Sequence, residues 1–147
     1  MFVDREKVLA KLEEEYKHPA FRFTILYGRR RVGKTTLIKQ YISSRPHLYF
    51  LVTQESMKLV LKRFQNIVAA QLDDVLLPNL TFENFEQIFA YITRQSFSEK
   101  LIIVIDEFQY LSKIDSSICC TKDSFGKKAF IYSYFRASSF MLLVLLP

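Results

Sequence analysis

The sequence predicts an α/β fold built on a parallel sheet, and three observations lead to that prediction. Short apolar runs alternate with stretches that repeat apolar residues at helical spacing. One of the runs, Leu101–Ile105, is apolar throughout, as is typical of a strand covered on both faces inside a parallel sheet. Half of the 147 residues are hydrophobic, so the chain has enough apolar material for one globular core.

The first half of the chain predicts two helix–strand units in succession. A helix capped by Asp4 is expected to end before Pro19. The aromatic and β-branched segment Phe21–Tyr27 predicts a buried strand, and the helical pattern Gly33–Ser43 follows it. A second short strand is expected at Leu48–Thr53.

The second half predicts two further helices and one or two further strands. We expect a long helix at Ser56–Leu72 and a second one at Phe82–Gln95, capped by Thr81. The strand Leu101–Ile105 comes next, and the apolar run Phe140–Leu146 predicts one more buried strand. This order of elements favours an α/β fold with right-handed crossovers.

Charge and cysteine content narrow the class of protein. The chain has 21 basic and 15 acidic residues, a net charge of +6, which suits anion binding but is too dispersed to support nucleic-acid binding by itself. The adjacent Cys119 and Cys120 lack a metal-binding pattern and are interpreted as free thiols, and His18 and His47 lack ligand partners in sequence. Without a secretory signal or a spanning apolar run, we expect a cytoplasmic location and no membrane span.

The strongest motif is GRRRVGKT at Gly28–Thr35, a full match to the P-loop (Walker A) pattern GxxxxGK[ST]. At average residue frequencies, a chain of this length would match by chance roughly once in a few hundred cases. An apolar strand enters the motif and an amphipathic helix leaves it, as this kind of site requires. The alternative is a glycine turn that carries a lysine by chance.

A P-loop binds the phosphates of a nucleotide with backbone N–H groups and with the positive end of a helix dipole. Lys34 would contact the β- and γ-phosphates, and the Thr35 hydroxyl would coordinate Mg²⁺. The predicted phosphate-binding residues are Gly28, Arg29, Arg30, Arg31, Val32, Gly33, Lys34, Thr35 and Thr36. The three arginines either help to neutralise phosphate charge or form a solvated loop tip.

A second motif, Asp106–Glu107, follows the apolar strand at Leu101–Ile105 and resembles a Walker B pair. Its acidic residues are expected at the carboxyl edge of the sheet, where open α/β folds bind ligands. Asp106 would hold Mg²⁺ through water, and Glu107 would polarise the attacking water. The predicted catalytic residues are therefore Glu107 and Lys34. The alternative is an ordinary strand end with a solvated turn.

Together, YGRRRVGKTTLI (Tyr27–Ile38) and IDEFQYL (Ile105–Leu111) resemble the archaeal-type ATPase family, which is related to the AAA proteins and belongs to the signal-transduction ATPases with numerous domains. Phe2–Glu6 is similar to that family's Phe-x-x-Arg-Glu box near the base. The likeness covers Met1 to about Ser112. It implies a parallel-sheet P-loop NTPase core of the additional-strand, catalytic-glutamate type that binds ATP with Mg²⁺ and hydrolyses it.

The end of the chain departs from that family. Members are expected to continue with a strand that ends in a polar sensor residue and with a helical lid, whereas Phe140–Leu146 ends without a sensor. We therefore expect residues 1–115 to be the N-terminal part of the ATPase domain, incomplete at its C-terminus. Residues 116–147 are interpreted as an atypical tail produced by a reading-frame shift or truncation.

The resulting functional prediction is ATP–Mg²⁺ binding, with hydrolysis weak or absent in this fragment. The alternative is a nucleotide-responsive regulatory or interaction module with little turnover and an unknown protein partner. A nucleic-acid-associated ATPase is a third option, and the dispersed charge gives it little support.

Overall fold

The computed structural model describes residues 5–19, 22–29, 31–114 and 139–146. The helices are α1 (Arg5–Lys17), α2 (Lys34–Ile42), α3 (Met57–Leu72), α4 (Phe85–Thr93) and α5 (Gln109–Ile114), with a 3₁₀ turn, η1 (Leu77–Asn79). The strands are β1 (Arg22–Gly28), β2 (His47–Leu51), β3 (Ile102–Asp106) and β4 (Ser139–Leu145). The predictions for Asp4, Arg30, Cys119 and Cys120 lie outside the described residues. Nearly every predicted helix and strand is present within one or two residues of its expected ends.

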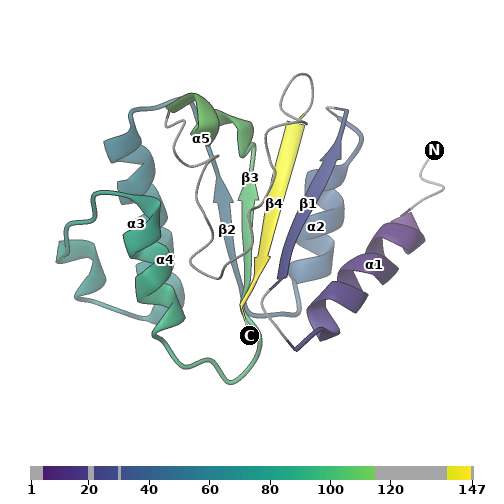
Figure 1. Ribbon diagram of the computed structural model, residues 1–147, viewed down its shortest axis with the longest axis horizontal. Helices are drawn as coiled ribbons and strands as arrows, with labels where there is room; N and C mark the ends of the chain where they lie inside the picture. The colour runs from purple at the N-terminus through teal and green to yellow at the C-terminus, as the bar shows by residue number, and fades with distance from the viewer. Residues whose placement is uncertain (1–4, 20–21, 30, 115–138, 147) are drawn as a thin grey trace.

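The four described strands form one mixed sheet in the order β1-β4-β3-β2 (Figure 1). Strands β2 and β3 pair in parallel, whereas β4 lies antiparallel to both β1 and β3. The predicted strand at the end of the chain is therefore present, but the expectation of a wholly parallel sheet is wrong for β4. An apolar run predicts that a strand is buried, but it does not predict the direction of that strand in the sheet. Direction depends on the connection, and residues 115–138 lie outside the described part of the chain.

Strand β3 is the centre of the fold because both of its faces are covered (Figure 1). All five of its residues are buried. Ile102 and Val104 pack with α1 and α2 on one face, and Ile103 and Ile105 pack with α3 and α4 on the other. This confirms the prediction from the uninterrupted apolar run and places the carboxyl end of β3 between two helical layers.

Helix α4 starts three residues later than the sequence predicts. Its cap is Asn84, whose side chain accepts a hydrogen bond of 3.0 Å from the Gln87 backbone N–H. The Gln87 side chain in turn accepts a bond from the backbone of Glu83 at 2.8 Å. The predicted cap at Thr81 is wrong, because Asn84 and not Thr81 has a glutamine three positions on, whose backbone N–H donates to the cap and whose side chain bonds the residue before the cap.

Helix α1 is fastened to α2 by a cluster of polar and aromatic contacts. The Tyr41 hydroxyl donates to the carbonyl of Leu12 at 3.0 Å, and burial raises the pKa of Tyr41 to about 12. Arg45 stacks 4.2 Å from the centre of the Tyr41 ring and pairs with Glu13 at 2.8 Å. These contacts hold the helix that begins at Lys34 in a defined position against the sheet.

The layer under α3 and α4 contains a cluster of phenylalanines, and Phe64 is at its centre. Phe64 is fully buried, with ring centres 5.1 Å from Phe50, 5.4 Å from Phe85 and 5.6 Å from Phe89. We expect Phe64→Ala to lower the free energy of unfolding by about 3–5 kcal/mol, because it removes a whole ring from a packed core. Urea unfolding followed by circular dichroism measures this change.

The control for that variant is Leu59→Ala on the same helix, since Leu59 is 55% exposed. Its effect on the free energy of unfolding is expected to stay within about 1 kcal/mol. Equal effects of the two substitutions would contradict the arrangement of α3 described above.

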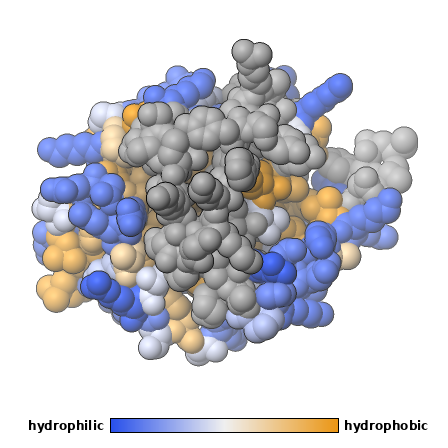
Figure 2. All heavy atoms as spheres, viewed as in Figure 1, coloured by the Kyte–Doolittle hydropathy of each residue, from blue (hydrophilic) through white to orange (hydrophobic). Residues whose placement is uncertain are grey.

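The surface of the molecule is mixed in character. Figure 2 shows hydrophilic side chains on both flanks of this view, with smaller hydrophobic patches at the lower left and right of the centre. None of the described helices combines the length and apolar character that a bilayer span requires.

Candidate functional site

The segment Gly28–Thr35 connects the end of β1 to the first turn of α2, as predicted. Gly33 has a φ of 81°, a left-handed conformation that glycine adopts without steric cost, and Arg31 has a φ of 64°. The N-cap residue is Gly33 itself, which has no side chain to accept a hydrogen bond from the start of α2. The first backbone N–H groups of this helix therefore remain directed toward the loop, together with the positive end of its dipole.

The ammonium group of Lys34 lies against the loop that precedes it. Its Nζ donates to the carbonyls of Gly28 and Arg29, both at 2.8 Å. Burial lowers the pKa of Lys34, and the carboxylates of Asp106 and Glu107 partly oppose that shift. Because a lysine ammonium has three donors, one remains beyond the two bonds found within the described residues.

The two predicted motifs meet at a hydrogen bond. The Thr35 hydroxyl donates to Oδ2 of Asp106 at 2.9 Å, although 71 positions separate the two residues in sequence. The same Oδ2 accepts a bond of 2.6 Å from the hydroxyl of Tyr49, and Oδ1 accepts one of 2.9 Å from the backbone N–H of Glu107. Asp106 is only 4% exposed, so these donors compensate for the loss of water around its charge.

The sequence analysis did not identify Tyr49. Burial, together with the bond to Asp106, raises the pKa of its hydroxyl above the ordinary value of 10.0. The hydroxyl therefore stays protonated at neutral pH and donates a hydrogen bond to Asp106. The contact between Tyr49 and Asp106 depends on the register between β2 and β3, and a local sequence pattern does not predict that register.

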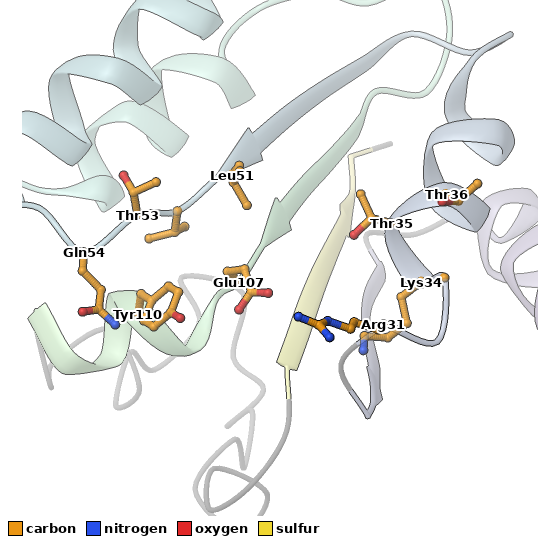
Figure 3. A pocket seen from close by; sticks show the side chains of 11 residues that line it. Arg31, Lys34, Thr35, Thr36, Leu51, Thr53, Gln54, Glu107 and Tyr110 are labelled. Atoms are coloured by element: carbon orange, nitrogen blue, oxygen red, sulfur yellow. The ribbon is translucent and has the colours of Figure 1, made fainter.

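Glu107 follows β3 with a φ of 56°, a left-handed conformation that is strained for a residue with a side chain. Its carboxylate contacts the side-chain amide of Gln109 at the start of α5. Figure 3 shows Glu107 between two groups of side chains, with Arg31 and Lys34 on one side and Gln54 and Tyr110 on the other. Strained residues of this kind often occur at functional sites.

These residues line a cavity with a volume of about 840 Å³ (Figure 3). Its lining consists of Arg31, Gly33, Lys34, Thr35, Thr36, Leu51, Val52, Thr53, Gln54, Glu107 and Tyr110. The wall formed by residues 51–54 was not predicted. The order of the strands is the signal that identifies it, because the carboxyl ends of parallel strands β2 and β3 meet at one edge of the sheet.

Arg63 of α3 contacts the segment that forms this wall. Its guanidinium contacts the Thr53 hydroxyl, pairs with Glu55 at 3.3 Å and donates to the carbonyl of Leu51 at 3.4 Å. The segment after β2 is thereby tied to the helix that follows it.

The other predicted site residues vary in their position. Arg31 and Thr36 line the cavity, whereas Arg29 and Val32 are not among its lining residues; all four are exposed, and Arg30 lies outside the described residues. Within the described ranges, no group of three or more His, Cys, Asp or Glu side chains is placed to hold a metal ion. A metal ion at this site would therefore be coordinated by a small number of protein oxygens and by a molecule bound in the cavity.

Comparison with known proteins assigns the chain to a family. A family model described as an ATPase domain predominantly from Archaea matches residues 2–136. The chain belongs to this family. No solved structure matches the chain.

Two relatives of this ATPase-domain chain come from Methanocaldococcus jannaschii. An uncharacterized protein, MJECL04, is 33% identical over 118 residues, which are 80% of this chain and 24% of the relative. An uncharacterized ATP-binding protein, MJ0423, is 47% identical over 45 residues, which are 31% of this chain and 76% of the relative. The chain thus spans about a quarter of the length of the first relative and about three quarters of the second.

Proposed function

We propose that this chain binds ATP with Mg²⁺ at a P-loop formed by Gly28–Thr35, facing the Asp106–Glu107 pair. The observation that carries the proposal is the 2.9 Å bond between Thr35 and Asp106. It joins two motifs that were identified independently in the sequence, and a chance lysine in a glycine turn gives no reason for such a bond. Membership of an ATPase-domain family and similarity to an ATP-binding protein support the same conclusion.

The phosphates would lie over the loop and the start of α2. The uncapped backbone N–H groups of that helix and the Lys34 ammonium both favour negative charge there. Thr36 and Arg31 line the same cavity and offer further donors, and we assign the phosphate role to these two rather than to Arg29, which is not among the lining residues.

The residues present fit Mg²⁺. This ion prefers oxygen ligands and is usually held by one or two carboxylates together with substrate phosphates. The Thr35 hydroxyl donates a hydrogen bond to Asp106 and keeps its oxygen lone pairs, so the pair supplies a hydroxyl and a buried carboxylate side by side. When bound, Mg²⁺ would neutralise phosphate charge.

Hydrolysis is the finer part of the proposal, with Glu107 orienting the attacking water. A second candidate is a nucleotide-responsive module with little turnover and a protein partner. The contact between Gln109 and Glu107 favours this candidate, because a carboxylate oxygen that accepts a bond from an amide is less available to water. Phosphate release at saturating ATP and Mg²⁺ separates the two candidates.

Calorimetric titration tests the binding proposal. We expect the chain to bind one ATP in the presence of Mg²⁺ and to bind AMP far more weakly, because AMP lacks the β- and γ-phosphates that the loop would hold. Equal affinity for ATP and AMP, or no binding of either, would contradict the phosphate assignment.

A further inference from the structure

Tyr49 is placed to act on Asp106 across the sheet. It lies opposite Val104 in the parallel pairing of β2 with β3, and Asp106 is two residues beyond Val104. Side chains two positions apart share one face of a strand, so Tyr49 and Asp106 project into the same layer. The distance of 2.6 Å between the hydroxyl and Oδ2 is typical of a strong bond from a hydroxyl to a carboxylate.

Helix α2 fixes the Tyr49 ring from the other side. The Nζ of Lys39 lies 4.9 Å from the centre of the ring. Lys39 is four residues after Thr35, so both side chains lie on the same face of α2. One face of α2 therefore contacts both residues, with Lys39 over the Tyr49 ring and Thr35 bonded to Asp106. Tyr49 and Asp106 are in turn bonded to each other.

The donors around Asp106 leave a defined acceptor position. An ionised carboxylate has about four lone-pair sites. Thr35 and Tyr49 both donate to Oδ2, and the backbone of Glu107 donates to Oδ1. Among the described residues, the site that these three bonds leave open is on Oδ1.

We propose that Tyr49 is a positioning residue for Mg²⁺, holding Asp106 so that Oδ1 presents its remaining acceptor site. The inference rests on the proposed function and adds a residue to it. Tyr49 is not among the residues that line the cavity, and its hydroxyl lies against Asp106 and Thr35, the two residues assigned to the ion. Its loss should therefore change the Mg²⁺ dependence of ATP binding and leave the metal-independent part of binding in place.

The test is Tyr49→Phe, which removes only the hydroxyl. We expect the Mg²⁺ concentration for half-maximal ATP binding to rise by about tenfold, the effect of losing one hydrogen bond to a charged group. ATP affinity in EDTA is expected to change by less than about twofold. Titration with ATP at a series of Mg²⁺ concentrations measures both quantities without relying on turnover.

Tyr41→Phe is the matched control. It also removes one tyrosine hydroxyl, whose bonds go to the Leu12 carbonyl and the Glu13 carboxylate rather than to the site. Both variants are expected to lose thermal stability, and only Tyr49→Phe should need more Mg²⁺. If Tyr49→Phe fails to fold, Lys39→Met keeps the hydroxyl, removes the cation above the ring and is expected to raise the Mg²⁺ requirement about threefold.

The outcomes distinguish the two proposals. A wild type that binds no ATP overturns the proposed function and this inference with it. The inference alone is overturned if the wild type binds ATP in a Mg²⁺-dependent way and Tyr49→Phe needs no more Mg²⁺ than the wild type. The same holds for Lys39→Met where that variant is used instead. Equal increases in Tyr49→Phe and Tyr41→Phe also overturn it, since the effect would then follow from general loss of stability.

Discussion

Replacement of Lys34 by alanine is expected to abolish ATP binding. The ammonium of Lys34 is held at the loop by the carbonyls of Gly28 and Arg29 and has a third donor beyond them. A hydrogen bond to a charged group contributes about 1.5–3 kcal/mol, so losing this remaining donor together with the positive charge beside the phosphates should weaken binding by about 100-fold or more. Calorimetric titration of both proteins with ATP and Mg²⁺ measures the loss.

The control for this variant is Lys58→Ala, which removes an exposed lysine from the first turn of α3. It matches the change in net charge, and its ATP affinity is expected to stay within about twofold of the wild type. Thermal unfolding of Lys34→Ala without nucleotide shows whether the loop needs the lysine for its own conformation. Undiminished binding in Lys34→Ala would falsify the phosphate assignment.

The local patterns of the chain were sufficient to predict most of its elements. Helix α3 and strand β3 lie within one residue of their expected ends because their apolar residues repeat with an unbroken period. The glycine-rich segment and the pair at Asp106 were predicted from residue type and context, and the Thr35–Asp106 bond brings the two together as expected. The functional roles of these residues stay predictions.

The features that sequence reasoning missed depend on contacts between distant elements. Asn84 rather than Thr81 caps α4, because two suitable cap residues lie close together and only the partner Gln87 decides between them. The antiparallel direction of β4 is not contained in its apolar run. The bond from Tyr49 to Asp106 requires the register of two strands, and a tyrosine in a short strand by itself predicts only burial.

The strained backbone of Glu107 links the fold to the proposed chemistry. The left-handed conformation at this position costs about 1–3 kcal/mol for a residue with a side chain. Two bonds oppose that cost, one from the Glu107 backbone to Asp106 and one between its carboxylate and Gln109. The carboxylate is thereby fixed at the cavity beside Lys34 rather than turned into solvent.

Replacement of Glu107 by glutamine is expected to keep ATP binding and remove hydrolysis. Glutamine has nearly the same shape and the same backbone strain, so the fold should be unchanged. It lacks the carboxylate that would polarise water, and loss of such a group typically lowers a rate by about 100-fold or more. Binding is expected to be equal to that of the wild type or tighter, because a negative charge near the phosphates is removed. Phosphate release at saturating ATP measures the rate, and calorimetry measures the binding.

Glu86→Gln is the control for that change, because it removes an exposed carboxylate on α4, away from the cavity. Its rate of phosphate release should equal that of the wild type. A Glu107→Gln variant that hydrolyses ATP at the wild-type rate would show that another group orients the water. A wild type without turnover, whose ATP affinity nevertheless depends on Lys34, would favour the regulatory module, because the site would then bind nucleotide without the hydrolysis proposed for Glu107.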